Sequence, residues 1–416
     1  MMKITKNTNC RICNSENLEK FLDLGEVGLV SNFIKKEDIK KDELIPKLNV
    51  YICKNCWLVQ IIDILNPEEL FLKDYPYYTG YITTMIDHFD GHAQDIATKF
   101  NLDQNSLVVD IGGNDGVFLN GFKKLDKNIN LLCVDPAPDI VNHTRKKDID
   151  VFNNFFGEKN ADVIKEKYGA ADVILSTNTF AHIDNIHDFM KGVKKLLKKD
   201  GVFIFENPYI VDILEKLQFD TMYYDHVSNF GIHPLNILFS QFDMTICDVK
   251  RTEVHGGSIL VSVKNNTNLK KFTSMPEELV ELEKSMRLNT IAPYTNFSSK
   301  VKKLRSEIIN GLRRIKGSKK RIVGYGASAR GNTTLCYCNI DTTIIDYIAD
   351  KNELKQNRYT PLTHIPILNP EKILEDMPDY VLIIAWNFAD EIILQLDEYK
   401  KRGGKFIIPI PEFKIV

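Results

Sequence analysis

One stretch, residues 107–119, constrains the fold more than any other part of the chain. Three apolar residues at its start predict a short buried strand that ends at Asp110, and a glycine-rich segment follows directly. Glycine lets the backbone turn sharply and approach a ligand closely. The spacing of Gly112, Asn114 and Gly116 lacks the third glycine of the dinucleotide motif Gly-x-Gly-x-x-Gly. The stretch therefore predicts a cofactor-binding loop of another kind in an α/β sheet.

A second acidic residue supports this interpretation. Asp135 follows the next predicted strand, 131–134, and lies 25 residues after Asp110. At about this separation an acidic side chain accepts hydrogen bonds from the ribose of a nucleotide cofactor. The alternative is an ordinary glycine turn without a ligand. The pairing of loop and acid favours the cofactor, and the loop fits a methyltransferase better than a nicotinamide enzyme.

Length and charge limit the classes of function. A chain of 416 residues is too long for one core and suggests about three domains. Its 54 basic and 56 acidic residues give a net charge of −2, which offers no general attraction to nucleic acid or an anionic membrane. No apolar run has the length of a signal peptide or a membrane span. We therefore expect a cytoplasmic protein with small-molecule partners.

Four cysteines form two Cys-x-x-Cys pairs, Cys10 with Cys13 and Cys53 with Cys56. Each pair can present two thiolates to one tetrahedral ion, and zinc is the usual choice. Four protein ligands would close the site, so a structural zinc (Zn2+) ion is expected. The alternative is four reduced cysteines without a metal.

From residue 107 onward, predicted strands at 131–134, 172–175 and 202–205 alternate with helices such as 186–197. Alternation of this kind predicts a doubly wound parallel sheet with its ligand at the carboxyl ends of the strands. Polar residues follow two of these strands, namely Asn178, His182 and Tyr209.

Residues 218–229 form the densest polar segment, in which Tyr223, Asp225 and His226 bring together a phenol, an acid and a base. A carboxylate beside a histidine can orient it and make it more basic. His255 opens a His-Gly-Gly-Ser turn that can place backbone amides near an anion. The alternative is that the histidine has a structural role only.

The last third of the chain contains a second α/β unit. Residues 266–318 are polar and helical in period, clearest at 301–315. Gly324-x-Gly326-x-x-Ala then follows a strand, and Asp350 ends the next predicted strand, 343–349. This is formally a nicotinamide motif. Two more strands, 381–385 and 406–408, and a helix at 391–399 complete this unit.

The chain resembles the sugar C-methyltransferase family in the order of its motifs. These are the cysteine pairs, the glycine loop, the polar segment, the His-Gly-Gly-Ser turn and the Gly-Tyr-Gly-Ala motif. The likeness covers nearly the whole chain. It is most specific at 324–335, 355–361 and 385–388. The resemblance implies a three-domain enzyme that uses S-adenosylmethionine to methylate C-3 of a nucleotide-linked 4-keto deoxysugar.

The resemblance also implies domains and partners. A zinc domain would span 1–70, the methyltransferase domain 71–265, a helical connector 266–318, and a Rossmann-like domain that contacts the nucleotide sugar 319–416. The substrate would be a nucleotide-diphosphate sugar, with no nucleic acid or membrane as partner. The protein would be a monomer or a small homo-oligomer.

Site residues follow from the residues and the resemblance together. His226 would remove the C-3 proton, and the enolate oxygen would be held by tyrosine or histidine donors. The catalytic set would be His226, Asp225, Tyr223 and one tyrosine of the cluster Tyr75, Tyr77, Tyr78 and Tyr81, with Tyr77 favoured. The cofactor set would be Asp110, Gly112, Asn114, Gly116, Asp135 and Asn178. The substrate set would be His182, Tyr209, His255, Gly326 and Arg330, with Arg330 as a phosphate partner.

The chain departs from the family pattern in the polar segment. Asp225 replaces a glutamate, Tyr224 a histidine and Asn229 a tyrosine. These changes keep three other interpretations open: methyl transfer to a sugar oxygen, an NAD-dependent oxidoreductase, and a non-catalytic binding protein.

Overall fold

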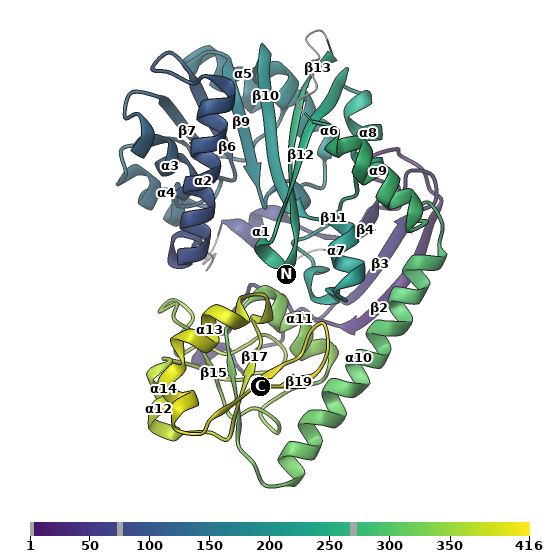
Figure 1. The fold of residues 1–416 in the computed structure, drawn as a ribbon, viewed down its shortest axis with the longest axis vertical. Coiled ribbons are helices and arrows are strands. Elements are labelled where there is room, and N and C mark those ends of the chain that lie inside the picture. The colour runs from purple at the N-terminus through teal and green to yellow at the C-terminus, as the bar shows by residue number, and fades with distance from the viewer. Residues whose placement is uncertain (1–3, 73–77, 267–272) are drawn as a thin grey trace.

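The computed structural model describes residues 4–72, 78–266 and 273–416. Figure 1 shows two α/β units at opposite ends of an elongated molecule, with the purple N-terminal sheet between them along one side and the long green helix α10 (Ala292–Gly317) beside it. The predicted α/β class with Rossmann-like sheets and a separate N-terminal cysteine region is confirmed.

The central sheet has seven strands in the order β12-β13-β10-β9-β6-β7-β8. Its parallel strands are β6 (Leu107–Ile111), β7 (Asn130–Val134), β8 (Asp150–Phe152), β9 (Ala171–Thr177) and β10 (Leu197–Pro208). The antiparallel strands are β12 (Met244–Thr252) and β13 (Ser258–Asn265). All five residues of β6 are buried, because helices cover both faces of the sheet.

Helices connect these strands in the pattern expected of crossover connections. They are α3 (Val117–Leu125), α4 (Pro138–Arg145), α5 (Glu158–Tyr168) and α6 (Ile186–Leu196). The further helices around this sheet are α2 (Thr83–Phe100), α7 (Ile210–Glu215) and α8 (Ile232–Ser240). Short 3-10 turns lie at Thr79–Tyr81, Phe180–His182, Phe219–Thr221 and Val254–Gly256.

The N-terminal sheet has the order β11-β4-β3-β2. Three of its strands are local, namely β2 (Leu18–Glu26), β3 (Lys47–Cys53) and β4 (Val59–Ile61). The fourth, β11 (Ser228–Asn229), comes from the polar segment that contains His226. A separate ribbon pairs β1 (Ile4–Lys6) with β5 (Asp63–Leu65), and the short helix α1 (Pro67–Phe71) follows. The predicted zinc region and the predicted catalytic segment are therefore joined by backbone pairing.

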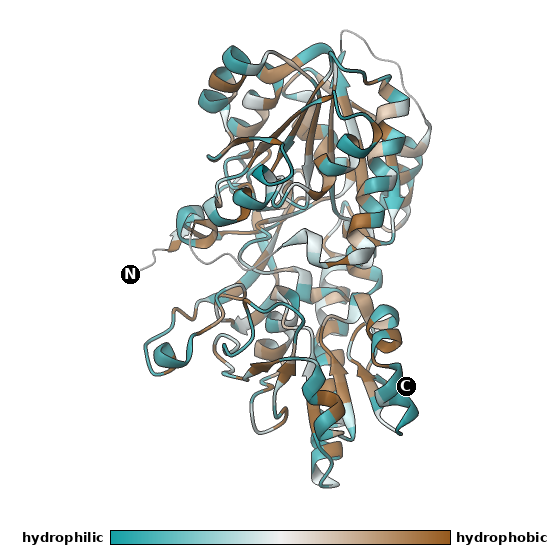
Figure 2. Ribbon diagram, turned by 90° about the vertical axis from the view of Figure 1, so that its left-hand side faces the viewer, coloured by the Kyte–Doolittle hydropathy of each residue, from teal (hydrophilic) through white to brown (hydrophobic). Residues whose placement is uncertain are grey.

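Helix α9 (Met275–Ser285) and α10 lead to the second α/β unit. Its sheet order is β16-β15-β14-β17-β18-β19. The strands are β14 (Ile322–Tyr325), β15 (Ile348–Ala349), β16 (Ile367–Leu368), β17 (Tyr380–Ile383), β18 (Lys405–Ile408) and the antiparallel β19 (Lys414–Ile415). The helices are α11 (Ala329–Tyr337), α12 (Glu371–Asp376), α13 (Ala389–Gln395) and α14 (Asp397–Lys401). Figure 2 shows apolar residues concentrated along the strands of both large sheets.

Two predicted elements differ from the structure. The strand expected at 343–349 is confined to β15, because the side chain of Asp341 accepts a hydrogen bond from the backbone N–H of Thr343 at 2.9 Å and forms a turn there. The helix expected at 391–399 is two helices, α13 and α14, that meet at Leu396.

Candidate active site

The first glycine loop joins β6 to α3 at the carboxyl edge of the central sheet. Gly112 has φ +74°, and a Cβ placed there would lie 2.1 Å from Oγ1 of Thr179. Gly116 has φ +72° and begins α3. Only glycine fits both the left-handed backbone and the close approach at Gly112. The loop therefore packs tightly against the turn after β9.

A cavity of about 370 Å3 opens beside this loop. Of the predicted cofactor residues, those that line it are Asp110, Gly112, Asn114, Asp135 and Asn178. Gly116 is not among the lining residues and shapes the start of α3 instead. The structure thus brings five of the six predicted residues, from three strand ends, to one cavity.

Asp135 shapes the loop and faces the cavity. Its Oδ2 accepts a hydrogen bond from the backbone N–H of Asn114 at 3.0 Å, and its Oδ1 accepts one from Ala137 at 2.9 Å. Burial raises the pKa of Asp135 to about 6, although these backbone donors oppose the rise. Burial and the charge of Asp135 raise the pKa of Asp110 to about 7. Both carboxylates can accept hydrogen bonds from hydroxyl groups of a ligand.

A second cavity, of about 320 Å3, lies between the central sheet and the C-terminal unit. The predicted residues that line it are His182, Tyr223, Asp225, His226, His255, Gly326 and Arg330. Asn178 and His182 line both cavities. The two cavities therefore adjoin at these two side chains, and a group bound in one can face a group bound in the other.

His226 is held in a defined orientation. Its Nδ1 lies 2.9 Å from the carbonyl oxygen of Thr221, an acceptor only, so Nδ1 carries the proton. Its Nε2 then has a free lone pair and accepts from the hydroxyl of Tyr223 at 2.8 Å. Burial, followed by the neighbouring His182, holds the pKa of His226 well below its usual value. The imidazole is therefore neutral, as a general base must be before it takes a proton.

Asp225 has a different partner from the expected one. Its Oδ2 accepts a hydrogen bond from Oγ of Ser31 at 2.8 Å, and both ring nitrogens of His226 have other partners. Burial raises the pKa of Asp225 to about 6. The expectation that this carboxylate orients the imidazole is therefore corrected: the carbonyl of Thr221 does so, and Asp225 ties the polar segment to the N-terminal region.

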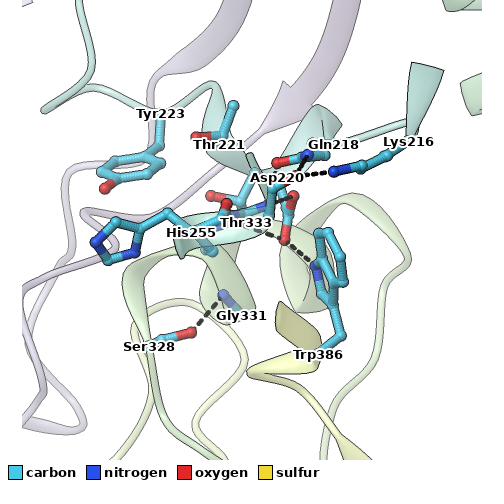
Figure 3. Close-up of polar contacts among 12 residues, drawn as sticks. Lys216, Gln218, Asp220, Thr221, Tyr223, His255, Ser328, Gly331, Thr333 and Trp386 are labelled. Carbon is cyan, nitrogen blue, oxygen red and sulfur yellow. Dashed lines mark hydrogen bonds and ion pairs between the residues drawn. The ribbon is translucent and has the colours of Figure 1, made fainter. Parts of the chain in front are cut away.

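Arg330 is also engaged differently. Its Nη2 and Nε donate to the two carboxylate oxygens of Asp220 at 2.8 and 3.2 Å, and its Nη1 donates to the carbonyl oxygen of His255 at 2.6 Å. The indole of Trp386 donates to the same carboxylate at 2.7 Å, as Figure 3 shows. Because Asp220 already balances its charge, Arg330 joins the two α/β units rather than serving as an unpaired phosphate cation.

Tyr209 lies away from the cavities. Its side chain is fully buried, and its hydroxyl donates to Glu283 of α9 at 2.9 Å. Pro208, one position earlier, lines the second cavity. Because neighbouring residues of an extended chain point to opposite sides, Tyr209 faces the core. Its predicted contact with substrate is thus corrected. Tyr77, the other predicted site tyrosine, lies outside the described residues.

The four cysteines converge as predicted. The Sγ atoms of Cys10 and Cys56 are 3.4 Å apart, and those of Cys13 and Cys53 are 3.5 Å apart. All four sulfurs lie within 4.8 Å of one another. A tetrahedral zinc ion with Zn–S bonds of about 2.3 Å needs sulfurs about 3.8 Å apart, so the cluster fits zinc.

Several residues around the site were not predicted from the sequence. The carbonyl of Thr221 orients His226, the side chain of Thr179 packs on the glycine loop, and Asp220 holds Arg330. A backbone carbonyl carries no signal in a sequence. Asp220 lies inside the polar segment, and its burial beside an arginine 110 residues away could not be inferred from spacing.

The fold and site together define an S-adenosylmethionine-dependent methyltransferase with a zinc-binding region. A methyltransferase domain model matches residues 109–203, and a zinc binding domain model matches residues 10–71. A C-methyltransferase C-terminal domain model matches residues 253–411. The chain belongs to the C-methyltransferase family.

Two curated proteins and one solved structure are similar to this chain. C-methyltransferase NovU of Streptomyces niveus is 30% identical and covers 98% of this chain and 96% of its own length. Carboxy-S-adenosyl-L-methionine synthase of Nautilia profundicola is 22% identical over 55% of this chain and 89% of that protein. An S-adenosylmethionine-dependent methyltransferase from Clostridium acetobutylicum is 14% identical, with a TM-score of 0.34 over 43% of this chain and 92% of that one.

Within the described residues, no helix has both the length and the apolar character needed to cross a bilayer.

Proposed function

We propose that this C-methyltransferase acts on a nucleotide-linked sugar and methylates C-3 of a 4-keto deoxysugar through an enolate, with His226 as the base. The observation that carries the proposal is the geometry of His226. Its Nδ1 proton is committed to the Thr221 carbonyl, its Nε2 accepts from the hydroxyl of Tyr223, and His226 lines the cavity that adjoins the cofactor cavity. A neutral, oriented imidazole suits removal of a proton made acidic by a neighbouring ketone.

Each of the two cavities suits one of the two reactants. S-adenosylmethionine, which supplies the methyl group when bound, fits the cavity lined by Asp110, Asn114 and Asp135. The sugar fits the second cavity, with its reacting carbon near Asn178 and His182, where the cavities adjoin. Such positioning accounts for much of the rate of a transfer between two bound molecules.

Hydrogen-bond donors near His226 suit a developing enolate oxygen. Tyr223 has its hydroxyl 2.8 Å from Nε2 of His226, and the His182 ring lies 4.9 Å from the His226 ring. Burial lowers the pKa of His182 to about 4, so its ring is neutral at neutral pH. One well-placed donor to an oxyanion contributes about 3 kcal/mol to catalysis.

We assign the nucleotide diphosphate to the C-terminal part of the second cavity. Gly326 has φ +89° and precedes α11, whose N-terminal end favours an anion. The cations that line the same cavity are Lys351, Lys355 and Arg330. Since Arg330 is paired with Asp220 and Nζ of Lys355 lies 3.7 Å from Oδ2 of Asp350, Lys351 is the better phosphate partner. This assignment makes 319–416 the substrate-binding domain, beside a zinc domain at 1–70, a methyltransferase domain at 71–265 and a helical connector at 266–318.

The carboxylate of Asp350 closes the glycine loop of the C-terminal unit, as the carboxylate of Asp135 closes the first glycine loop. Oδ2 of Asp350 accepts from the backbone N–H of Ala327 at 2.7 Å, and its Oδ1 accepts from Asn352 at 2.8 Å. Methyl transfer to oxygen has little support from Tyr224, which is buried and is not among the cavity-lining residues.

The test is to incubate the purified protein and S-adenosylmethionine with TDP-, GDP- and CDP-linked sugars, each with and without a 4-keto group, and to weigh the products by mass spectrometry. We expect a gain of one methyl group only with 4-keto sugars, together with loss of the C-3 hydrogen. Methylation of non-keto sugars would contradict the proposal. Exchange of the C-3 hydrogen in deuterium oxide, with S-adenosylhomocysteine in place of the methyl donor, tests the base step separately.

A further inference from the structure

A cluster of two histidines and a glutamate lies apart from the residues assigned above. His88 and His92 are one helical turn apart on α2, so their side chains lie on the same face of the helix. Glu206 lies near the carboxyl end of β10 and faces them. Nε2 of His88 is 2.8 Å from Oε2 of Glu206, and Nε2 of His92 is 3.8 Å from Oε1. Each imidazole thus approaches a different oxygen of one carboxylate.

The cluster is buried. The side chain of Glu206 is fully buried, that of His92 is 5% exposed and that of His88 is 12% exposed. A carboxylate buried to this extent needs a counter-charge or hydrogen-bond donors. Both ion pairs of Glu206 within the described residues come from these imidazoles.

Hydrogen bonding alone leaves the cluster incomplete. Nε2 of His88 donates to Oε2 of Glu206 at 2.8 Å, and the hydroxyl of Thr252 donates to Oε1 of Glu206 at 2.8 Å. Nε2 of His92 is buried and has no hydrogen-bond partner, although it points at the same carboxylate. A single cation among the three side chains would satisfy this nitrogen and neutralise Glu206 together.

We propose that His88, His92 and Glu206 form a second metal site, which takes a divalent transition-metal ion. The three ligand atoms already lie within 4.8 Å of one another. Two imidazoles four residues apart on a helix and one carboxylate form a common ligand set for zinc, and the same set suits iron, cobalt or nickel. Thr252 acts through Glu206, because its hydrogen bond fixes the orientation of the ligating carboxylate.

The site would join helix α2 to the central sheet. Glu206 also contributes the backbone carbonyl that accepts from Asn178 at 2.8 Å, and Asn178 lines both cavities. With three protein ligands, the ion keeps a coordination position for water, unlike the closed four-cysteine cluster. The inference does not depend on the identity of the methyl acceptor.

The test counts metal ions in the full-length, zinc-loaded protein. The chain is equilibrated with excess Zn2+, freed of unbound ion by gel filtration, and analysed for metal per chain. We expect two ions in the wild type and one in His88→Asn and in His92→Asn. His233→Asn, at an exposed histidine of α8, is the matched control and should keep two. Cobalt titration adds a separate readout, since thiolate and imidazole sites differ in their visible spectra.

One ion per chain in the wild type would overturn the proposal, and so would a second ion that survives in both histidine variants. In that case the cluster is a hydrogen-bonded counter-charge for Glu206 only. If a variant fails to fold, an anomalous-scattering map of wild-type crystals decides: a peak between His88, His92 and Glu206 supports the site, and a peak at the cysteines alone refutes it. We expect Thr252→Val to lower the affinity for the second ion by about tenfold or more, while the ion at the four cysteines stays bound.

Discussion

The guanidinium of Arg11 donates from Nε to Oδ1 of Asp184 at 2.9 Å, between positions 173 residues apart in the chain. Arg11 lies between the first two cysteines, and Asp184 lines the cofactor cavity. Nη1 of Arg11 also donates to the carbonyl oxygen of Val227 at 3.2 Å, directly after His226. One buried side chain therefore connects the cysteine region to the first cavity and to the segment that holds His226.

We expect Arg11→Met to lower the free energy of unfolding in urea by about 2 kcal/mol, because it removes a buried charge partner and leaves Asp184 unpaired. Since Asp184 is 35% exposed, water compensates part of the loss. The affinity for S-adenosylhomocysteine, measured by calorimetry, should also fall. Lys20→Met removes an exposed ion pair with Asp23 and is the control, with an expected change below about 1 kcal/mol. Equal effects of the two variants would contradict this role for Arg11.

We expect His226→Asn to reduce C-3 hydrogen exchange and methyl transfer by about 100-fold or more, because a general base is lost. The affinity for S-adenosylhomocysteine should not change, since His226 does not line the cofactor cavity. Exchange at the wild-type rate in this variant would show that another group takes the proton.

The hydroxyl of Tyr223 donates to the basic nitrogen of His226. We therefore expect Tyr223→Phe to keep measurable C-3 exchange and to change its pH profile, whereas His226→Asn leaves no profile to follow. The measurement is the exchange rate in deuterium oxide across a pH series. A Tyr223→Phe profile identical to that of the wild type would show that the phenol does not act on the base.

The pKa of His182 gives a pH dependence of stability. Burial lowers this pKa from 6.5 to about 4, so the folded chain holds His182 neutral while the unfolded chain takes up a proton below about pH 6.5. The unfolded state binds more protons between these values, so the contribution of His182 to stability is lost as the pH falls from 6.5 to 4. We expect His182→Gln to reduce this loss by about 2 kcal/mol, as measured by urea unfolding at several pH values.

Asp225 should show the opposite sign and serves as the comparison. Burial raises its pKa from 3.8 to about 6, so the folded state binds more protons between these values. Its contribution is present below pH 3.8 and is lost as the pH rises through 6. We therefore expect Asp225→Asn to reduce the fall in stability that accompanies rising pH. If both variants shift the profile in the same direction, the two pKa changes do not control it.

The pair of Arg330 and Asp220 should contribute strongly to stability. Asp220 is fully buried, so Arg330→Met leaves an unpaired buried charge and should cost about 3–5 kcal/mol. The double variant Arg330→Met with Asp220→Asn should recover part of this loss in urea unfolding. Arg321→Met, at a half-exposed ion pair with Asp346, is the control and should cost about 1 kcal/mol or less. A double variant less stable than Arg330→Met would contradict the pairing argument.

Local patterns predicted the fold well. The glycine loop, the cysteine pairs and the alternation of strands and helices each depend on residues close together in the sequence. The central sheet, the cysteine cluster and the position of five predicted residues around one cavity agree with these patterns. The predicted length of strand β15 was too great, because the turn at Asp341 that precedes it depends on one side-chain hydrogen bond.

The partners within the site were harder to predict. Asp225 is adjacent to His226 in sequence, yet its hydrogen bond goes to Ser31, 194 positions away. Arg330 carries a charge suited to phosphate, yet Asp220 neutralises it. Both cases depend on contacts between distant segments, which spacing along the chain does not encode. The prediction for Tyr209 was wrong for a simpler reason. Pro208 lines the second cavity, and the side chain of the next residue in an extended segment points the opposite way.

The pairing of β4 with β11 has a consequence for how the chain folds. Val59 and Gln60 pair with residues 228–229, so the edge of the N-terminal sheet stays open until about 170 further residues have been synthesised. An open edge strand is a site of aggregation, and late closure of a distant pair slows folding. A ribosome that has released only the first 70 residues has therefore made the metal ligands of the N-terminal region, but not the strand that completes its sheet.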